Sequence, residues 1–306
     1  MFKKVASPLR ALLLIFKPKQ LLKNHRWLWA QRVELSKQID SLVMFGHLGV
    51  QIGPDTPRTS KSEMKQLLGK FRVMDVDSNL VRLGSETDGG YVLPDLLSPD
   101  MVCFSAGVHT NSDFESDLAK RGIKSHLIDF SVAGPAVNNE LFSFERKFLS
   151  SVTFLDSHVN LDDWVGKLES DQELLLKMDI EGSEWAVLSS ASSDTLERFN
   201  LMVIEFHGLD RLGLAGPFSI MNRVLNRILE RFDIVNAHPN NYRGESIFFG
   251  ARVPEVLEIT FVNKRLNISG VSVSSQLRAP NLPNNPEAKE LQLDDYCFTP
   301  IESRDQ

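Results

Sequence analysis

The stretch LLLKMDIEGSEW, residues 174–185, carries an apolar run straight into a group of acids. Three leucines precede Lys177, and Asp179, Glu181 and Glu184 follow almost at once. An apolar run of this length is typical of a buried strand, and the segment after it has the pattern of a helix. Ligands of open α/β sheets bind outside the carboxyl ends of the strands. The stretch therefore predicts a strand over 173–180, a helix from about Glu184 to Arg198, and a site between them.

Strand and helix patterns alternate along most of the chain around this stretch. The alternation predicts a mostly parallel sheet with helices on both faces, and two late strands predict an antiparallel pair at one edge. The expected strands are 101–107, 124–130, 150–156, 173–180, 201–207, 233–238 and 256–264, and the further helices are 112–122, 161–169 and 217–232.

Composition and charge narrow the class of protein. The chain has 306 residues, of which 42% are hydrophobic and 24% charged, as is ordinary for a globular protein with a sizeable core. Its net charge of -6 argues against a dedicated nucleic-acid binder. Cys103 and Cys297 are far apart and lack metal-ligand spacing, so we expect reduced thiols in a cytoplasmic protein.

The first 32 residues are basic and differ from the rest of the chain. Their apolar run, Leu9 to Phe16, is shorter than the roughly 20 residues that span a bilayer. Basic residues with Trp27 and Trp29 suit either a membrane surface or a helix docked on the body or on a partner. Helical spacing over 33–48 and a break at 53–63 predict a helical extension over 1–60, a main domain over 70–266 and a tail over 267–306.

Gly107 and Asp129 follow the first two strands and suit a nucleoside site. A glycine lets the backbone approach a ligand, and an acid about 20 residues later can accept hydrogen bonds from ribose hydroxyls. The loop has one glycine rather than a full dinucleotide fingerprint. A turn glycine and a strand-end acid without function remain an equal alternative.

Acids and histidines also follow the later strands. Glu205 and His207 are two residues apart and point to one face of a strand. If their strand neighbours the strand before Asp179, these three side chains converge, and His238 follows the next strand. Ionisable groups facing one cleft are costly unless they bind something. The alternative is that each acid ends its strand in solvent or caps the next helix.

The stretch LLLKMDIEGSEWAVL, with its companions, resembles the signature of FkbM-type methyltransferases. The companion segments lie in the expected order over about residues 80–264: LVRLGSETDGGYVLPD at 80–95, CFSAGVHTNSDFESDLAKRG at 103–122, NLDDWV at 160–165, LMVIEFHGL at 201–209, AHPNN at 237–241 and VPEVLEITFVNK at 253–264. The resemblance implies a Rossmann-like class I methyltransferase fold with a seven-stranded sheet. It also implies S-adenosylmethionine as cofactor and methylation of a hydroxyl on a sugar, glycan or glycosylated metabolite.

The resemblance and the strand-end positions together give the candidate site residues. The predicted cofactor contacts are Asp88, Tyr91, Ser105, Gly107, Asp129 and Glu181, and the predicted catalytic residues are Asp179, His207, Glu205 and His238. Two mechanisms fit. In one, His207 or Asp179 takes the acceptor proton directly, with histidine favoured near neutral pH. In the other, Asp179 and Glu205, with or without His207, hold a divalent cation that lowers the pKa of the acceptor. Oxygen ligands favour magnesium or manganese, whereas the histidine shifts the choice toward a transition metal. Direct base catalysis is favoured because no adjacent ligand pair marks a metal site.

Two other functions remain to be weighed against this one. A dehydrogenase or sugar-nucleotide enzyme on a Rossmann sheet predicts a full glycine fingerprint, which the chain lacks. A non-catalytic methyltransferase-like module, docked on a glycan-synthesis enzyme through its basic leader, predicts a degraded acidic site, whereas the acids here are present. We therefore expect a small molecule or a glycan as acceptor, and no nucleic-acid partner. Through the leader we expect contact with a membrane surface or another protein.

Overall fold

The computed structural model describes residues 58–168, 172–272 and 280–294. The basic leader and the helix expected over 33–48 lie outside the described residues. The first described helix is α3 (Lys61–Leu68). It begins at Ser60, whose side chain accepts from the backbone N–H of Glu63 while the Glu63 carboxylate accepts from that of Ser60. This reciprocal cap satisfies two N–H groups that the first helical turn leaves free.

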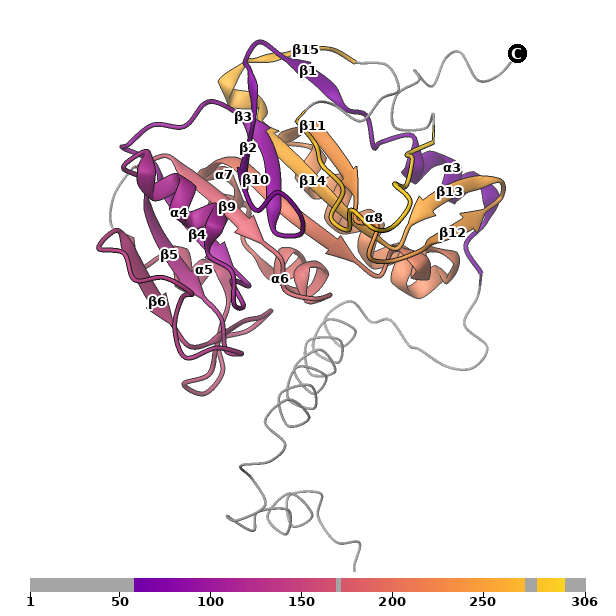
Figure 1. The fold of residues 1–306 in the computed structure, drawn as a ribbon. Coiled ribbons are helices and arrows are strands. Elements are labelled where there is room, and N and C mark those ends of the chain that lie inside the picture. Colours follow the sequence, from indigo (N-terminus) through magenta and orange to yellow (C-terminus); the bar gives the residue numbers. More distant parts are fainter. Residues whose placement is uncertain (1–57, 169–171, 273–279, 295–306) are drawn as a thin grey trace, which may run out of the picture. The chain divides into compact units, whose positions relative to one another are not determined.

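A seven-stranded sheet forms the centre of the domain (Figure 1). Its order is β11-β14-β10-β9-β4-β5-β6, and only β14 runs antiparallel to its neighbours. The strands are β4 (Val102–Ala106), β5 (Lys124–Ile128), β6 (Phe142–Glu145), β9 (Leu174–Met178), β10 (Phe199–His207), β11 (Phe232–Pro239) and β14 (Val256–Asn263). This arrangement confirms the predicted mostly parallel sheet with an antiparallel pair at one edge.

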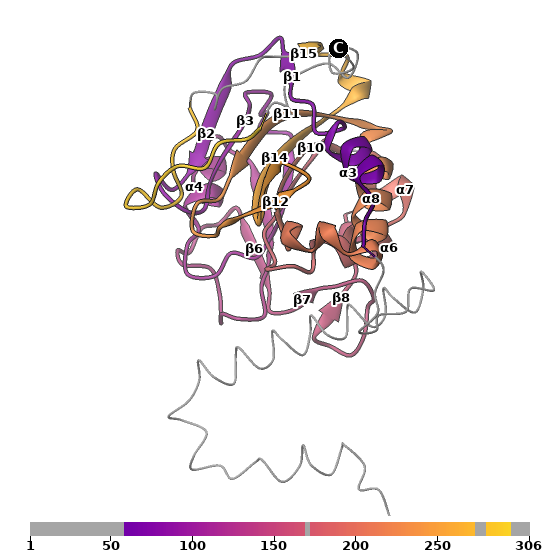
Figure 2. The ribbon, with the colours of Figure 1, turned by 90° about the vertical axis from the view of Figure 1, so that its right-hand side faces the viewer.

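Different elements cover the two faces of the sheet (Figure 2). One face packs against α3 and four further helices, and the other against α4 and a hairpin. The helices are α4 (Asp113–Lys120), α5 (Leu161–Val165), α6 (Glu184–Ser190), α7 (Ser193–Glu197) and α8 (Ala215–Leu229), and the hairpin strands are β2 (Leu80–Gly84) and β3 (Gly90–Pro94). The Thr260 hydroxyl on β14 donates to the carbonyl of Val92 at 2.5 Å, which ties the hairpin to the sheet.

Alternation along β9 explains why acids and a lysine follow so apolar a run. All five of its residues are buried, so the strand lies between two packed layers. Leu176 and Met178 point to the helical layer, whereas Leu175 packs toward the hairpin layer. By the same alternation Lys177 and Asp179 belong to the hairpin face. The charged residues of the opening stretch thus share one face at the carboxyl end of the sheet.

Two predicted elements were wrong. The strand expected over 150–156 is absent, and the sheet is completed by β6 instead; Leu155 has a φ of 51°, which no strand accommodates. The helix expected from Glu184 to Arg198 is divided into α6 and α7. The Ser192 side chain accepts from the backbone N–H of Thr195, and a serine that caps a new helix ends the preceding one.

The residues predicted as a tail contact the domain. The strand β15 (Ser269–Ser272) pairs with β1 (Met74–Val76), and Asn241 donates to the carbonyl of Asn285 at 2.8 Å. The remaining elements are the parallel pair β7 (Phe148–Leu149) and β8 (His158–Val159), the hairpin β12 (Glu245–Phe248) and β13 (Ala251–Pro254), and the short helices η1 (Leu209–Gly213) and η2 (Lys264–Leu266). Within the described ranges no helix is both long enough and apolar enough to cross a membrane.

Candidate active site

Four neighbouring strands place ionisable side chains in one row on the hairpin face. Glu205 on β10 lies directly opposite Glu258 on β14, and Glu258 lies opposite His238 on β11. Asp179 directly follows β9, whose last residue, Met178, lies beside the residue that precedes Glu205. Directly opposite residues share a face of the sheet. We call Asp179, Glu205, Glu258 and His238 the polar row.

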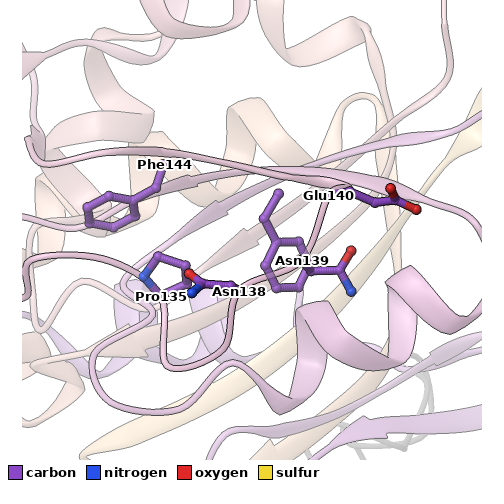
Figure 3. A pocket seen from close by; sticks show the side chains of 6 residues that line it. Pro135, Asn138, Asn139, Glu140 and Phe144 are labelled. Carbon is purple, nitrogen blue, oxygen red and sulfur yellow. The ribbon is translucent and has the colours of Figure 1, made fainter.

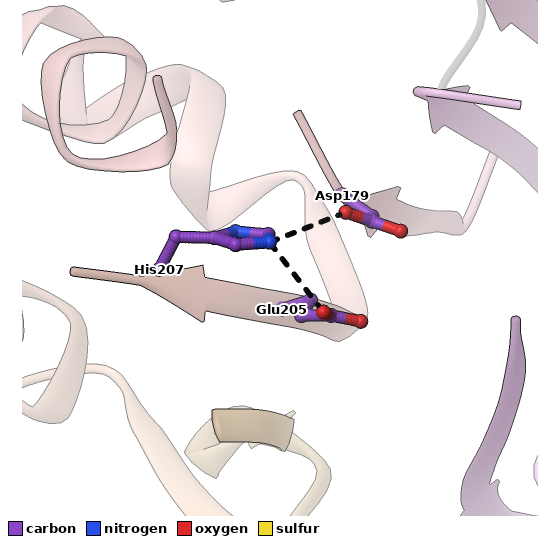
Figure 4. A group of neighbouring side chains, drawn as sticks. All are labelled: Asp179, Glu205 and His207. Carbon is purple, nitrogen blue, oxygen red and sulfur yellow. Dashed lines mark ion pairs between the residues drawn. The ribbon is translucent and has the colours of Figure 1, made fainter. Parts of the chain in front are cut away.

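At one end of this row, Asp179 and Glu205 meet His207 (Figure 4). The Nε2 atom of His207 lies 3.5 Å from a carboxylate oxygen of Glu205 and 4.0 Å from one of Asp179. One ligand atom from each of the three residues lies within 4.8 Å of the other two. The convergence predicted from their strand-end positions is confirmed.

Glu184 fixes the ring of His207 from the helical side. The side chain of Glu184 is fully buried, and its Oε1 lies 3.1 Å from the Nδ1 of His207. The same oxygen accepts from the backbone N–H groups of Ile180 and Gly182. Burial lowers the pKa of the His207 imidazole, but Glu184 and the other carboxylates outweigh burial and raise this pKa to about 9. A pKa of about 9 favours the protonated imidazole near neutral pH, so it favours Asp179 over His207 among the two predicted bases.

Asp179 is the acid of this group that stays accessible. Its side chain keeps 26% of its surface exposed, and its Oδ2 accepts a hydrogen bond of 3.1 Å from the Tyr91 hydroxyl. Burial raises the pKa of Asp179 to about 6, although Lys177 and His207 favour the ionised form. Tyr91, predicted to contact the cofactor, is almost fully buried, and its hydroxyl is engaged with Asp179.

The turn after Asp179 has an unusual backbone. Glu181 has a φ of 58° and Gly182 a φ of 106°. A non-glycine residue in the left-handed region is uncommon and is concentrated at functional sites. The turn leaves Glu181 exposed, with its Oε2 3.9 Å from the Nε2 of His207. Glu181 therefore faces the site from its solvent side.

Gly107 and Asp129 lie together at the ends of β4 and β5. Gly107 has a φ of 79°, and a Cβ atom there would overlap the backbone oxygen of Asp179. The carboxylate of Asp129 accepts from the backbone N–H groups of Val108 (3.1 Å), His109 (2.8 Å) and Ser131 (2.6 Å). Glycine is thus required at position 107 because two loops approach closely there. Asp129 holds the loop that follows Gly107 through the backbone of Val108 and His109.

Ser105 and Lys177 lie beneath this loop rather than at its surface. Ser105 is fully buried and donates to the carboxylate of Glu115. The hydroxyl predicted to contact the cofactor is therefore engaged within the protein. The Nζ of Lys177 donates to the carbonyl of Gly107 at 2.5 Å. Lys177 therefore fixes the loop from below.

His238 and Asp88 lie away from Asp179. His238 is buried between Glu258 (3.3 Å) and Glu290 (3.0 Å), so the structure does not bring this predicted catalytic residue to the centre of the row. Asp88 lies in the β2–β3 turn, where Gly89 has a positive φ of 81°. The Oδ1 of Asp88 accepts from the side-chain amides of Asn240 and Asn284.

Sequence reasoning missed Glu258 and Asn284. Glu258 is the single acid within the apolar strand β14, and an isolated acid in such a strand was a usable signal. Asn284 gave no signal, because it lies in the segment predicted to be a separate tail. Its contacts follow only from the return of that segment to the hairpin face.

A surface pocket of about 360 Å³ lies beside β6, at the far edge of the sheet from β11 (Figure 3). Its lining residues are Pro135, Asn138, Asn139, Glu140, Phe142 and Phe144. None of the residues predicted for cofactor binding or catalysis lines this pocket, so it is separate from the polar row.

Comparisons with known proteins place the chain in a family. No curated protein is significantly similar in sequence. Among solved structures, a fibrillarin/Nop5p complex aligns with a TM-score of 0.34 and 11% identity, over 55% of this chain and 74% of that chain. A putative prophage DNA modification methyltransferase from E. coli gives 0.31 and 11%, over 60% and 52%. A mutant of the 16S rRNA (adenine(1408)-N(1))-methyltransferase from Catenulisporales acidiphilia gives 0.27 and 9%, over 60% and 98%.

These structural similarities are too weak to say anything about activity. The match to a sequence family is stronger evidence. The Methyltransferase FkbM domain matches residues 69–243, more than half of the chain. The matched part contains β4, β5, β9 and β10, and with them Asp129, Asp179 and the residues around His207. The chain therefore belongs to the FkbM methyltransferase family and is an S-adenosylmethionine-dependent methyltransferase.

Proposed function

We propose that the enzyme transfers a methyl group to a hydroxyl of a sugar, glycan or glycosylated metabolite, with Asp179 as the general base. The observation that carries this proposal is the position of the Asp179 carboxylate. It is partly exposed at the carboxyl end of β9, next to the loop of Gly107, and burial raises its pKa to about 6. A base whose pKa lies near the operating pH is both ionised and able to hold a proton.

The chemistry asks little covalent help from the chain. The cofactor supplies a methyl group on a sulfonium centre, so the protein has to align the acceptor oxygen and remove its proton. An alcohol hydroxyl is a weak nucleophile at neutral pH, and proton removal by Asp179 makes it a better one. The Tyr91 hydroxyl, which donates to Asp179, holds the carboxylate in position for this step.

The imidazolium of His207 supports Asp179 rather than replacing it. Its positive charge favours the ionised form of Asp179, and its Nδ1 is held by Glu184. Glu205, by contrast, has a pKa raised well above its usual range, by burial first and by Asp179 and Glu258 next. Of the three converging residues, Asp179 is therefore the one that fits a base near neutral pH.

The cofactor fits the ends of β4 and β5. A carboxylate offers about four acceptor positions, and Asp129 uses three of them on backbone N–H groups. A position remains for a ribose hydroxyl, which supports Asp129 as the residue that holds the nucleoside. Gly107, Asp88 and Glu181 stay in the proposal as further predicted cofactor contacts. Ser105 and Tyr91 are left out because their polar atoms are engaged elsewhere.

A metal-assisted mechanism is the alternative for the same residues. Asp179, Glu205 and His207 offer ligand atoms within 4.8 Å of one another. A cation there would have to displace the proton that His207 holds, which its raised pKa opposes. Exhaustive chelation separates the two mechanisms. Full activity in chelator supports Asp179 as base. Activity that dies with chelator while the protein stays folded by circular dichroism, and that returns with magnesium or manganese, contradicts it.

We further propose which partners the enzyme contacts. The net charge of -6 supports an enzyme without a nucleic-acid partner. The basic residues with Trp27 and Trp29 support contact of the leader with a membrane surface or a protein partner, in a cytoplasmic setting.

The acceptor class is tested by transfer of label from methyl-labelled S-adenosylmethionine to a panel of sugars, glycans and glycosylated metabolites. Label in a base-stable methyl ether on a carbohydrate is the expected product. Label that enters only nitrogen or carboxyl groups would contradict the proposed hydroxyl acceptor.

A further inference from the structure

We propose that Asp88, Glu205 and Glu258 bind a divalent cation of the magnesium, calcium or manganese type. This site would join the β2–β3 turn, the sheet and the segment that carries Asn284. It shares Glu205 with the catalytic group but includes neither Asp179 nor His207. It is therefore distinct from the proposed base, Asp179, although Asp88 is also one of the predicted cofactor contacts.

The geometry of the sheet creates a charge problem that a cation would solve. Glu205 and Glu258 lie directly opposite each other on β10 and β14, and only 4% and 3% of their surfaces are exposed. Like charges directly opposite in a sheet are destabilising, and burial removes the water that would screen them. One ligand oxygen from each of Asp88, Glu205 and Glu258 lies within 4.8 Å of the other two.

The neighbouring histidines are already shared among other carboxylates. His207 faces Asp179, Glu181 and Glu184 besides Glu205. His238 faces Glu290 besides Glu258. The other side chains that donate hydrogen bonds to the three acids are neutral amides: Asn240 donates to Glu205 and Asp88, and Asn284 donates to Glu258 and Asp88. The guanidinium of Arg82 interacts electrostatically with Glu258 but donates no hydrogen bond to it. Neutral amides orient carboxylates but do not cancel their charge.

Two buried oxygens in this group lack hydrogen-bond partners among the described residues. They are the Oε2 of Glu205 and the Oδ1 of Asn284, and Asn284 has 1% of its surface exposed. The amide of Asn284 already lies between Asp88 and Glu258. A half-turn of this amide exchanges its nitrogen for its oxygen, so Asn284 can supply a fourth oxygen ligand when a cation is present.

The chemistry of the donors selects the kind of cation. Every donor is a carboxylate or amide oxygen, which suits magnesium, calcium and manganese and disfavours zinc and copper. Two oxygens bound to one Ca²⁺ at 2.3–2.6 Å are at most about 5 Å apart, and the three acids meet this limit. Asp88 is exposed, so the site can be reached from solvent and water can fill the remaining coordination positions.

A shared proton is the competing way to neutralise the two buried glutamates. Burial and the nearby acids Asp179, Glu258 and Asp88 raise the pKa of Glu205 well above its usual value. A proton and a cation differ in one measurable respect, because only the cation makes the stability of the fold depend on added metal.

Metal titration of the full chain tests the proposal without any cofactor or acceptor. The protein is freed of metal with chelator, dialysed at pH 8 and titrated with Mn²⁺, with binding followed by electron paramagnetic resonance. Thermal melting is followed in parallel with Mg²⁺ and Ca²⁺. We expect one Mn²⁺ per chain and a higher melting temperature with metal. Asp88→Asn should weaken Mn²⁺ binding about tenfold or more, and as an exposed turn residue it is a mild change for the fold.

Asp179→Asn is the matched control, because it removes an acid from the catalytic group but not from this site. It should bind Mn²⁺ as the unaltered chain does. Absence of binding at millimolar Mn²⁺ would overturn the proposal, as would unchanged affinity in Asp88→Asn. Loss of binding in Asp179→Asn with retention in Asp88→Asn would move the cation to Asp179, Glu205 and His207. None of these readouts depends on methyl transfer, so their failure and that of the proposed function are distinguishable.

Discussion

At the scale of single residues, the neighbouring side chains of Asp179, Glu205 and His207 differ sharply in pKa. Burial and adjacent carboxylates raise the pKa of Glu205 well above its usual value. The pKa of His207 rises to about 9 and that of Asp179 to about 6. Environments that push neighbouring pKa values apart assign the acid and base roles of a site. Asp179 alone combines access to solvent with a pKa suited to accept a proton.

The first prediction concerns His207 and pH. Its folded pKa of about 9 lies above the 6.5 of an unperturbed histidine, so its contribution to stability is complete below pH 6.5 and is lost as pH rises through 9. His207→Gln should therefore lower the free energy of unfolding by up to about 3 kcal/mol at pH 6, and by much less near pH 9. Urea denaturation across this range measures the difference. His126, whose pKa burial lowers, is the control whose replacement should give no such trend.

A deficit in His207→Gln that stayed the same from pH 6 to pH 9 would contradict this reading. It would mean that the imidazole contributes by packing and neutral hydrogen bonds. His207 would then carry no positive charge that favours the ionised form of Asp179.

The second prediction concerns Asp129 and the cofactor. Asp129→Ala should weaken S-adenosylmethionine binding by about 1–3 kcal/mol, the scale of hydrogen bonds to a charged group. Calorimetric titration measures the affinity, and circular dichroism checks that the variant is folded. Asp113→Asn, an exposed acid at the start of α4, is the matched control and should bind as the unaltered chain does. Equal affinity in a folded Asp129→Ala would remove Asp129 from the cofactor site.

At the scale of elements, the β2–β3 hairpin carries the groups that reach the row from above. Tyr91 on β3 donates to Asp179, and Asp88 in the turn lies beside Glu205 and Glu258. The hairpin is fastened to β14 through the carbonyl of Val92. Its position therefore sets both the orientation of Asp179 and the spacing of the acids below it.

The third prediction follows from this arrangement. A hydrogen bond to a carboxylate favours its ionised form, so Tyr91→Phe should raise the pKa of Asp179. The acidic limb of the pH–rate profile should move to higher pH, while the affinity for S-adenosylmethionine stays unchanged. A variant with weaker cofactor binding and an unshifted profile would instead support the direct cofactor contact predicted for Tyr91 from the sequence.

Sequence patterns predicted the elements with a strong apolar pattern. They failed where a few local contacts determine whether an element forms or where it ends. β9 and α8 are strongly patterned and were found within a few residues of their bounds. β6 is short and half-buried at the sheet edge, so its pattern is weak. The break between α6 and α7 depends on one serine cap, Ser192, which competes with a continuous helical pattern. A contact of this kind depends on one or two residues, so it hardly changes the periodic pattern of apolar residues from which helices and strands are predicted.

At the scale of the whole molecule, the site could be predicted as far as it follows from strand ends. Parallel strands bring their carboxyl ends to one edge, so Asp179, Glu205 and His207 could be placed together from the sequence, with Asp129 at the same edge after β5. Glu258 escaped because β14 runs antiparallel and brings its beginning, not its end, to that edge. Asn284 escaped because only tertiary contacts return its segment to the hairpin face.

The fourth prediction concerns the basic leader. Residues 1–32 precede the matched residues 69–243, and every group assigned to the cofactor lies after residue 80. Removal of residues 1–32 should leave the affinity for S-adenosylmethionine unchanged by calorimetry and reduce binding to vesicles that contain anionic lipid. Lower cofactor affinity in a stable truncated protein would show that the leader takes part in closing the site.

The central claim is that Asp179 is the base of methyl transfer, and one paired measurement on Asp179→Asn tests it. Asparagine keeps the shape and can still accept from Tyr91, but it cannot take the acceptor proton. We predict cofactor affinity close to that of the unaltered chain, with transfer of label to the acceptor reduced about 10²- to 10⁴-fold, the usual contribution of a general base. Full transfer by a folded Asp179→Asn that binds S-adenosylmethionine normally would contradict the claim and leave the acids after β9 a structural role.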